Sequence, residues 1–228
     1  SGGLIEASYS RNLGAAVTGS PVVLSNNRIA VATSQKLFLI DTDGSIVFEK
    51  PLPAQVAGGL TLADLNRDYS LDIVFVLISG EVYAVSQQGQ NLPGFPVSTN
   101  DNFNCPPLIA DIDSDSQYEM ILHSQLNSLH VYNHDGSIAE GFPFATIYNG
   151  ATPGTLVDLD NSGYFMLVTG YSNGILVANL RRPVSDLTPW ITYRGNSMRH
   201  GAYATTGFVA NDNQVQSPAL DKLGQNFP

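Results

Sequence analysis

Short apolar runs recur along most of the chain, and turn-forming residues separate them. One stretch shows the pattern in full: an apolar run at residues 107–110 leads into an acidic loop, and two segments of alternating apolar and polar residues follow. An Asp135-Gly136 pair and a Gly-Phe-Pro sequence at residues 141–143 then end the unit. Because an Asp-Gly pair next to alternating runs is a strong hairpin signal, the pattern predicts short antiparallel strands.

The same unit returns at a spacing of 47 residues. Moving the sequence by that distance places Ala110-Asp111 on Ala63-Asp64 in one direction and on Val157-Asp158 in the other. A fixed period of this length is typical of one solenoid or ring. The repeats are expected near residues 18–53, 54–98, 104–146 and 150–206.

Each repeat is expected to contain three or four short strands. In the first repeat they are expected at residues 22–24, 29–33, 36–41 and 46–49. In the second they are expected at residues 60–63, 73–78 and 81–85, and in the fourth at residues 154–157, 164–169 and 175–179. Residues 4–9 also alternate, and we interpret them as the outer strand of a unit whose other strands lie upstream.

Such strands cannot bury both faces within one repeat, and radial stacking of the repeats around a channel is the usual solution. The sequence therefore predicts an all-β fold, a β-propeller with about four blades of four antiparallel strands each. The blades and a closing segment are expected to cover residues 1–206. The ring is expected either to be small or to be part of a larger one, because about four blades is the lower end of the known range.

The composition fits this interpretation. Hydrophobic residues make up 43% of the chain and charged residues 13%, with 21 Gly and 13 Pro, as expected for many short strands joined by tight turns. The longest apolar run, residues 73–78, is too short to span a membrane. The formal net charge of −10 argues against a nucleic-acid partner, and the single cysteine, Cys105, excludes an internal disulfide.

Many of the acidic residues lie in the repeat loops, at positions 1, 3, 5 and 9 of a nine-residue stretch. A tight turn brings alternate side chains of such a loop to one point, and oxygen ligands at this density favour Ca²⁺. The expected ligands in the third repeat are Asp111, Asp113, Asp115 and Glu119, with the backbone carbonyl of Gln117. The expected ligands in the second repeat are Asp64, Asn66, Asp68 and Asp72, with the carbonyl of Ser70.

The residues themselves leave an alternative open, because the same side chains can form Asx turns that cap loops without any ion. Neither loop has glycine at position 6, where Tyr69 and Ser116 stand, so a slacker turn than in a helix-flanked calcium loop is expected.

The loops of the other repeats depart from the pattern. In the fourth repeat Asp158 and Asp160 keep positions 1 and 3, but Ser162 replaces the third acid and Met166 the last, so a weak or empty site is expected. In the first repeat the loop is reduced to residues 25–27, and no metal is expected there.

Residues 170–174 match the G-x-S-x-G pattern of serine hydrolases around Ser172, with Asp186 and His200 following in hydrolase order. That motif works only at a sharp turn from a strand into a helix, and no helix is expected here. Ser172 is therefore interpreted as a hairpin residue. We assign no catalytic role to the four histidines, His123, His130, His134 and His200, because none has a partner at zinc-binding spacing.

The repeated pattern of an apolar residue, Ala-Asp and alternating acids resembles the FG-GAP or VCBS repeats of bacterial secreted proteins and of the integrin α-chain propeller. The resemblance covers roughly residues 18–182 and is carried by the second and third loops. It implies propeller blades with Ca²⁺ in the loops between inner strands, bound by the residues named above for those two loops.

Two segments near the end of the chain add to the resemblance. Residues 189–201, beginning Pro-Trp-Ile-Thr-Tyr-Arg, resemble the closing segment of such bacterial propellers. There Trp190 is expected to cover the outer edge of the last blade while Arg194 and Arg199 cap acidic loops; a plain edge strand is the alternative. Residues 219–228 are similar to the opening of the type IX secretion sorting domain, so residues 207–228 are expected to form a linker leading into a truncated sorting domain.

The leading hypothesis from the sequence is a non-catalytic, calcium-stabilised propeller module of a secreted or cell-surface bacterial protein. It would serve adhesion, binding of a protein or glycan ligand, or support of an upstream domain. The alternative is part of a secreted enzyme, a polysaccharide lyase or a peptidase, whose active site includes the propeller. A catalytic carboxylate pair would need a shared pocket, whereas the loop acids are expected to be committed to metal.

Overall fold

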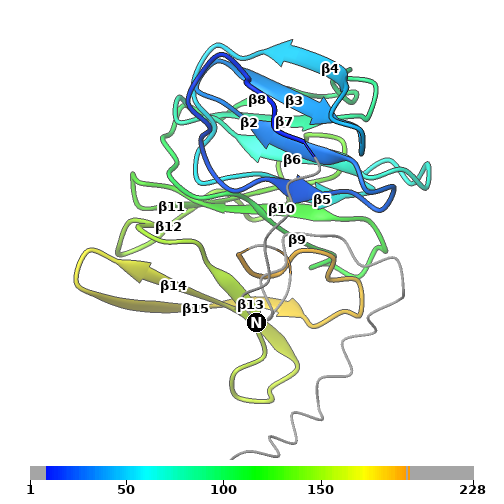
Figure 1. The fold of residues 1–228 in the computed structure, drawn as a ribbon. Helices are drawn as coiled ribbons and strands as arrows, with labels where there is room; N and C mark the ends of the chain where they lie inside the picture. Colours follow the sequence, from blue (N-terminus) through cyan, green and yellow to red (C-terminus); the bar gives the residue numbers. More distant parts are fainter. Residues whose placement is uncertain (1–8, 194, 196–228) are drawn as a thin grey trace, which may run out of the picture.

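The computed structural model describes residues 9–193 and 195, and all regular secondary structure in this part of the chain is β-strand (Figure 1). The strands form four separate antiparallel sheets, and within each sheet they are ordered as in the sequence. The prediction of an all-β fold is confirmed.

The first sheet contains β1 (Val22–Val23), β2 (Ile29–Ala32), β3 (Lys36–Ile40) and β4 (Ile46–Pro51). The second contains β5 (Thr61–Ala63), β6 (Asp72–Val76), β7 (Glu81–Val85) and β8 (Val97–Ser98). The third contains β9 (Leu108–Ala110), β10 (Glu119–His123), β11 (Ser128–Tyr132) and β12 (Phe144–Ala145). The fourth contains β13 (Thr155–Val157), β14 (Tyr164–Tyr171) and β15 (Gly174–Pro183).

The fourth sheet has three strands in the described residues, one fewer than a four-stranded blade but equal to the three strands expected in the fourth repeat. In the third repeat the chain turns after β11, where the backbone N–H of Gly136 donates to the carbonyl of Asn133 (2.9 Å). The fourth repeat has no Asp-Gly pair at the corresponding place, and β15 continues to Pro183 instead.

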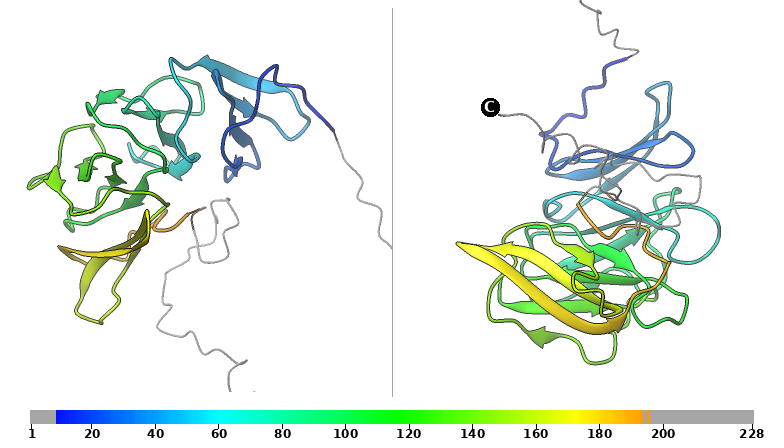
Figure 2. Two further views of the ribbon diagram at one scale, coloured as in Figure 1. Left: turned by 90° about the vertical axis from the view of Figure 1, so that its left-hand side faces the viewer. Right: turned by 90° about the horizontal axis from the view of Figure 1, so that it is seen from below.

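The four sheets follow one another along an arc, with the first and fourth sheets at its two ends (Figure 2). Neighbouring sheets meet at their first strands: Thr61 of β5 donates from Oγ1 to the carbonyl of Pro107, just before β9 (2.9 Å). The predicted radial arrangement of successive repeats is therefore present.

Both faces of the inner sheets are apolar, because each faces a neighbouring sheet. On β10, Met120 and Leu122 belong to the large core cluster shared with the first and second sheets. Ile121, between them, belongs to a second cluster with Phe165 and Leu167 of the fourth sheet. Side chains alternate between the two faces of a strand, so one continuous apolar run supplies both interfaces.

The segment that follows β15 does not lie at the outer edge of the last blade, where the sequence predicted it. Trp190 is 1% exposed and exchanges backbone hydrogen bonds with Ile109 of β9, at 2.8 and 3.2 Å. The next residue, Ile191, accepts a hydrogen bond from Leu156 of β13 (2.9 Å). The prediction that Trp190 covers the outer edge of the last blade is wrong: the segment joins the first strands of the third and fourth sheets, whose free edges offer unpaired backbone groups.

Several expectations concern residues outside the described part of the chain. These are most of the predicted outer strand at residues 4–9, the capping roles of Arg194 and Arg199, and the linker and sorting segment at residues 207–228.

Candidate metal centre

Three acidic loops connect the first and second strands of the second, third and fourth sheets, and they share one backbone conformation. Positions 4 and 6 have positive φ in every loop: 59° and 66° at Arg67 and Tyr69, and 66° and 70° at Ser114 and Ser116. In the fourth sheet the corresponding angles are 55° at Asn161 and 80° at Gly163. The lack of glycine at position 6 therefore does not relax the turn, contrary to the expectation of a slacker loop.

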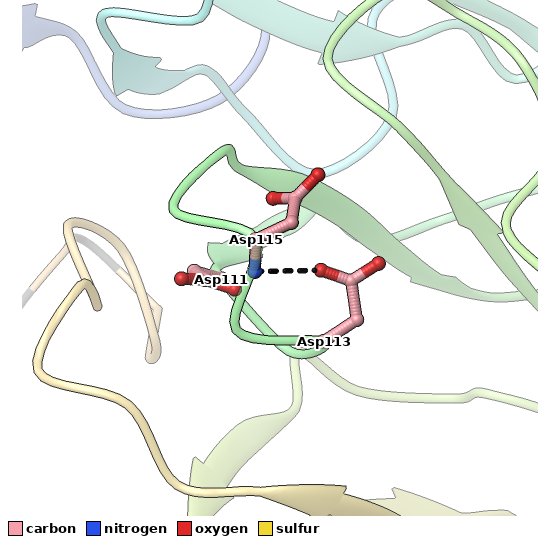
Figure 3. Close-up of side chains that lie close together, drawn as sticks. All are labelled: Asp111, Asp113 and Asp115. Carbon is pink, nitrogen blue, oxygen red and sulfur yellow. Dashed lines mark hydrogen bonds between the residues drawn. The ribbon is translucent and has the colours of Figure 1, made fainter.

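The third loop is folded by hydrogen bonds from its own backbone to its carboxylates. Asp111 accepts from the N–H groups of Ser114 (2.7 Å) and Ser116 (3.1 Å), one on each carboxylate oxygen. Asp113 Oδ1 accepts from the N–H of Asp115 (3.2 Å), the bond drawn in Figure 3. Asp115 Oδ1 accepts from the N–H of Gln117 (2.6 Å).

These bonds bring the three aspartates of the third loop together (Figure 3). One carboxylate oxygen from each of Asp111, Asp113 and Asp115 lies within 4.8 Å of the others. Asp111 is buried, and the other two are exposed to solvent. This group can hold a metal ion.

Glu119, the fourth predicted ligand of this loop, is 1% exposed at the start of β10. Its Oε2 accepts a hydrogen bond from the backbone N–H of Ile112 (2.8 Å). Burial raises the pKa of Glu119 to about 8, and the negative charges of the loop aspartates contribute to the increase. A nearby cation would oppose both effects.

The second loop is folded by a similar set of hydrogen bonds, with the N–H of position 5 rather than of position 4 bound to the first aspartate. Asp64 accepts from the N–H groups of Asp68 (3.0 Å) and Tyr69 (2.9 Å), and Asp68 Oδ1 accepts from Ser70 (2.8 Å). The side chain of Asn66 donates to the other oxygen of Asp68 (3.1 Å). Among the described residues, three acids gather within 4.8 Å in the third loop only, so the structure does not bring Asp64, Asp68 and Asp72 together in the same way.

Asp72 takes the place of Glu119 in the second loop and is 1% exposed. Its Oδ2 accepts from the N–H of Leu65 (3.0 Å), whereas its Oδ1 is buried and has no hydrogen-bond partner among the described residues. Burial raises the pKa of Asp72 to about 7, with further contributions from Asp68 and Asp64. A buried acceptor without a partner costs about 1–3 kcal/mol, and a cation ligand would satisfy it.

The fourth loop has the same turn without the buried acid. Asp158 accepts from Ser162 (2.9 Å) and Gly163 (2.9 Å), and Asp160 accepts from Ser162 (3.1 Å). The hydrogen bond from Ser162 lowers the pKa of Asp160. Met166, at 7% exposure, stands where the other loops have a carboxylate.

The burial of the side chain at position 2 differs between the fourth loop and the other two. The role of this residue was not predicted from the sequence. Leu65 and Ile112 are each 1% exposed, whereas Leu159 is 59% exposed. In the second and third loops the N–H of position 2 binds the buried carboxylate of position 9, so the carboxylate holds the apolar side chain against the core. The signal in the sequence is an apolar residue at position 2 together with an acid at position 9.

A second contact was also missed. The backbone of Asp111 is held from both sides by the segment after β15: Ser185 Oγ donates to its carbonyl (2.7 Å), and its N–H donates to the carbonyl of Leu187 (2.9 Å). The partners lie 74 residues apart for the Ser185 bond, so no local pattern indicates them.

The catalytic candidates considered in the sequence lie in ordinary structural positions. Ser172 lies in the hairpin turn between β14 and β15, where Tyr171 pairs with Gly174, and no helix follows it in the described part of the chain. His130 is buried and bonded through Nε2 to the carboxylate of Asp101 (3.0 Å). The Asp101 partner was not predicted, and His200 lies outside the described residues.

Comparison with known proteins identifies the fold. No family model and no curated protein matches this sequence. The computationally designed Ika4 protein matches 77% of this chain over 99% of its own length, with 16% identity and a TM-score of 0.53. BamB from Moraxella catarrhalis matches 79% of this chain over 68% of its own length, with 11% identity and a TM-score of 0.51. The fold is a β-propeller.

Proposed function

We propose that this chain is a non-catalytic β-propeller module whose second and third acidic loops each bind Ca²⁺. The proposal is carried by one recurring arrangement: a turn lined with carboxylates that ends in a buried acid, Asp72 in one loop and Glu119 in the other. Because both acids are removed from water, the charge of each ionised carboxylate needs a partner, and a cation in the loop would supply it.

The donor set favours Ca²⁺ among the common ions. It consists of oxygen atoms, from Asp111, Asp113, Asp115 and Glu119 in the third loop, with the carbonyl of Gln117. The second loop would use Asp64, Asn66, Asp68 and Asp72, with the carbonyl of Ser70. Ca²⁺ accepts about 6–8 oxygen ligands in flexible geometry, whereas Mg²⁺ usually keeps several waters, and thiolate-preferring metals find no sulfur here.

Calcium is expected to act on stability. An ion that binds only the folded state adds RT ln(1 + [L]/Kd) to the free energy of unfolding. Thermal unfolding of the whole chain should therefore occur at a higher temperature in Ca²⁺ than in EDTA, with a smaller effect of Mg²⁺. Asp113→Asn should reduce the calcium-dependent shift, and Asp160→Asn, the matched change in the fourth loop, should leave it intact.

Equal melting temperatures in Ca²⁺ and EDTA would remove the metal proposal. All three acidic loops would then be turns formed by Asx hydrogen bonds alone, as is expected of the fourth loop. If Asp160→Asn reduced the calcium-dependent shift in melting temperature as strongly as Asp113→Asn, the fourth loop would contribute to binding as much as the third, contrary to the proposal.

We propose further that the module serves ligand binding, adhesion or support of another domain in a secreted or cell-surface protein. The support is the resemblance of its repeats and its last segments to secreted bacterial propellers. The described residues include no helix that is long and apolar enough to cross a membrane. Localisation is tested by fractionating the source cells and treating intact cells with protease, and a protein confined to the cytoplasm would contradict it.

The alternative, a part in an enzyme active site, has weaker support. The loop acids are bound by the N–H groups of their own loops, and Ser172 lies in a hairpin turn. A panel of glycan and peptide substrates tests this alternative. Turnover that Asp111→Ala abolishes, with the fold intact by circular dichroism, would favour the enzyme.

A further inference from the structure

Strand β15 carries a bulge near its end. The register between β14 and β15 shifts there, and residues 180–182 lie opposite Phe165 alone. Arg181, in the middle of the bulge, has φ of 54°, a left-handed conformation that is uncommon for a residue other than glycine. Its N–H donates to Oδ1 of Asn179 (2.7 Å). Bulges redirect side chains, often beside functional sites, and strained residues gather where ligands are held.

The bulge forms one wall of a cleft of about 460 Å³ between the third and fourth sheets. The opposite wall is the segment from Glu140 to Phe144, which leads into β12. Small-molecule sites have volumes of about 300–1,000 Å³, so the cleft is large enough for a ligand of this kind. Phe142 packs on the apolar cluster that contains Leu180, whereas Glu140 and Arg181 are exposed. The cleft thus has an apolar side and is open to solvent.

The guanidinium group of Arg182 is held in place at this cleft. One of its Nη atoms donates to the backbone carbonyl of Glu140 (2.6 Å). Its Cζ lies over the ring of Phe142, 5.8 Å from the ring centre. The hydrogen bond uses one N–H donor, and no other described residue binds the rest of the group. A planar group that is already oriented loses less entropy when it binds a ligand.

Neither arginine of the bulge is paired with an acid. Elsewhere in the protein, Arg28 binds the carboxylate of Asp41 at 3.1 Å. In the described part of the chain, no carboxylate lies within 4.0 Å of a guanidinium nitrogen of Arg181 or Arg182. Two adjacent cations without acidic partners stand out in a chain whose formal net charge is −10. Because arginine recognises carboxylates through paired hydrogen bonds, the cleft is complementary to a ligand with a carboxylate group.

The other groups of the cleft narrow the class of ligand. Glu140 accepts hydrogen bonds from hydroxyl groups, but its charge repels a ligand that carries several negative charges. Asn179 uses its Oδ1 for Arg181 and keeps its amide N–H groups as donors. The rings of Phe142 and Phe144, with centres 5.3 Å apart, offer apolar surface to C–H groups. A sugar with one carboxylate per ring has the carboxylate, the hydroxyls and the C–H groups that match this set.

We propose that this cleft binds an acidic sugar of the uronic acid type. Arg181 and Arg182 bind the carboxylate of the sugar, and Glu140 and Asn179 bind its hydroxyl groups. This inference rests on the role in ligand binding proposed above and names the class of ligand. The cleft shares no residue with the second and third acidic loops, so binding of the sugar does not require calcium.

The test is isothermal calorimetry of the whole chain with trisaccharides of galacturonic acid and of glucuronic acid. The titrations are run in EDTA, because Ca²⁺ itself bridges acidic sugars. At least one of the two trisaccharides should bind, and its methyl ester, which lacks the charge, should bind about tenfold more weakly or less. Arg181→Gln and Arg182→Gln should each weaken binding about tenfold or more, since each removes hydrogen bonds to a charged group.

Both variants are checked by circular dichroism. Arg181→Gln is the more secure of the two, because the Arg181 side chain is exposed and has no described hydrogen-bond partner. The matched control is Arg67→Gln in the second acidic loop. Arg67 is also an exposed arginine with positive φ, 59°, and it is not a predicted metal ligand. This control should bind the sugar with unchanged affinity.

No binding of either trisaccharide would overturn the proposal. Equal affinity for the methyl ester, or full affinity in both arginine variants of the bulge, would also overturn it. A hexaglutamate peptide that bound as tightly as the sugar would show that the cleft recognises carboxylates without the sugar, contrary to the proposal. The calcium sites are judged separately, by melting in Ca²⁺ and in EDTA, so the failure of one proposal can be told from the failure of the other.

Discussion

The buried carboxylate of Asp72 accepts a hydrogen bond from the N–H of Leu65, seven residues earlier in the chain, and leaves its second oxygen without a described partner. Glu119 and Ile112 repeat the relationship in the third loop. In both cases the acid closes a turn that other carboxylates line. The arrangement is stable only if the charge gathered there is neutralised by protons or by a cation.

The first prediction concerns the charge of Asp72. Asp72→Asn keeps the shape of the side chain but removes a buried negative charge beside Asp64 and Asp68. In EDTA the variant should unfold at the same temperature as the wild type or higher, because the desolvation penalty of the carboxylate is gone. In Ca²⁺ it should gain less stability than the wild type. Thermal unfolding in both conditions measures the two effects.

Asp160→Asn is the control, because Asp160 is exposed in the loop that lacks a buried acid. A variant of Asp72 that loses stability in EDTA and keeps the full calcium effect would show that the carboxylate has a purely structural role.

The second prediction is a pH dependence of the metal-free protein. The pKa of Asp72 is raised from 3.8 to about 7, and that of Glu119 from 4.5 to about 8, so the folded state binds protons more tightly than the unfolded state. Stability from these groups is fully present below their unfolded pKa values and is lost as the pH rises toward 7 and 8. Denaturant unfolding in EDTA at several pH values should therefore show declining stability over this range.

The control is the double variant Asp72→Asn with Glu119→Gln, which should show a flatter profile. His123 acts in the opposite direction, because burial lowers its pKa, and its contribution remains in both proteins. Identical pH profiles for the wild type and the double variant would contradict the assignment. With saturating Ca²⁺ the decline should disappear, because metal binding favours the ionised carboxylates.

The third prediction concerns position 6 of the loops. Tyr69 has φ of 66° and is 99% exposed, so its side chain contributes little packing. The left-handed conformation costs a non-glycine residue about 1–2 kcal/mol, and glycine returns about 0.5–1 kcal/mol of this through its flexible unfolded state. Tyr69→Gly should therefore raise the free energy of unfolding by up to about 1 kcal/mol.

The reverse change is available in the fourth loop. Gly163 has φ of 80°, and a methyl group added at its Cα would have no neighbouring atom within 4 Å, so Gly163→Ala tests the backbone alone. It should reduce the free energy of unfolding by about 1 kcal/mol. If Tyr69→Gly and Gly163→Ala change the free energy of unfolding in the same direction, backbone conformation does not determine the stability of these loops.

The fourth prediction compares the two Gly-Phe-Pro sequences. Gly94 and Gly141 have nearly equal φ, 85° and 86°. A methyl group on Gly94 would meet the carbonyl of Asp135 in the next sheet, whereas one on Gly141 would meet nothing within 4 Å. Gly141→Ala should reduce the free energy of unfolding by about 1 kcal/mol through φ alone, and Gly94→Ala by about 2–4 kcal/mol. Denaturant unfolding of both variants measures the difference, and equal losses would exclude a tight contact between the sheets.

The sequence predicted features that depend on neighbouring residues. The expected strand at residues 36–41 is β3 (Lys36–Ile40), and the expected strand at residues 81–85 is β7 (Glu81–Val85). The turn residues and the alternation of apolar side chains determine these elements within a few positions. The spacing of acids also located the group formed by Asp111, Asp113 and Asp115.

Features that depend on distant contacts could not be predicted in this way. The position of Trp190 depends on free backbone groups of β9 and β13, and the pairing of His130 with Asp101 joins residues on different elements. Glycine at position 6 proved unnecessary for the turn, because hydrogen bonds to Asp64 and Asp111 hold the strained backbone. Local patterns carry no information on which distant groups meet.

Calcium titration by isothermal calorimetry on the whole chain, after removal of metal with chelator, tests the central claim most directly. The account predicts binding at two sites per chain, with Asp72→Asn and Glu119→Gln each removing or weakening one of them and Asp160→Asn changing neither. Absence of binding heat at every temperature tested, together with an unchanged melting temperature, would contradict it.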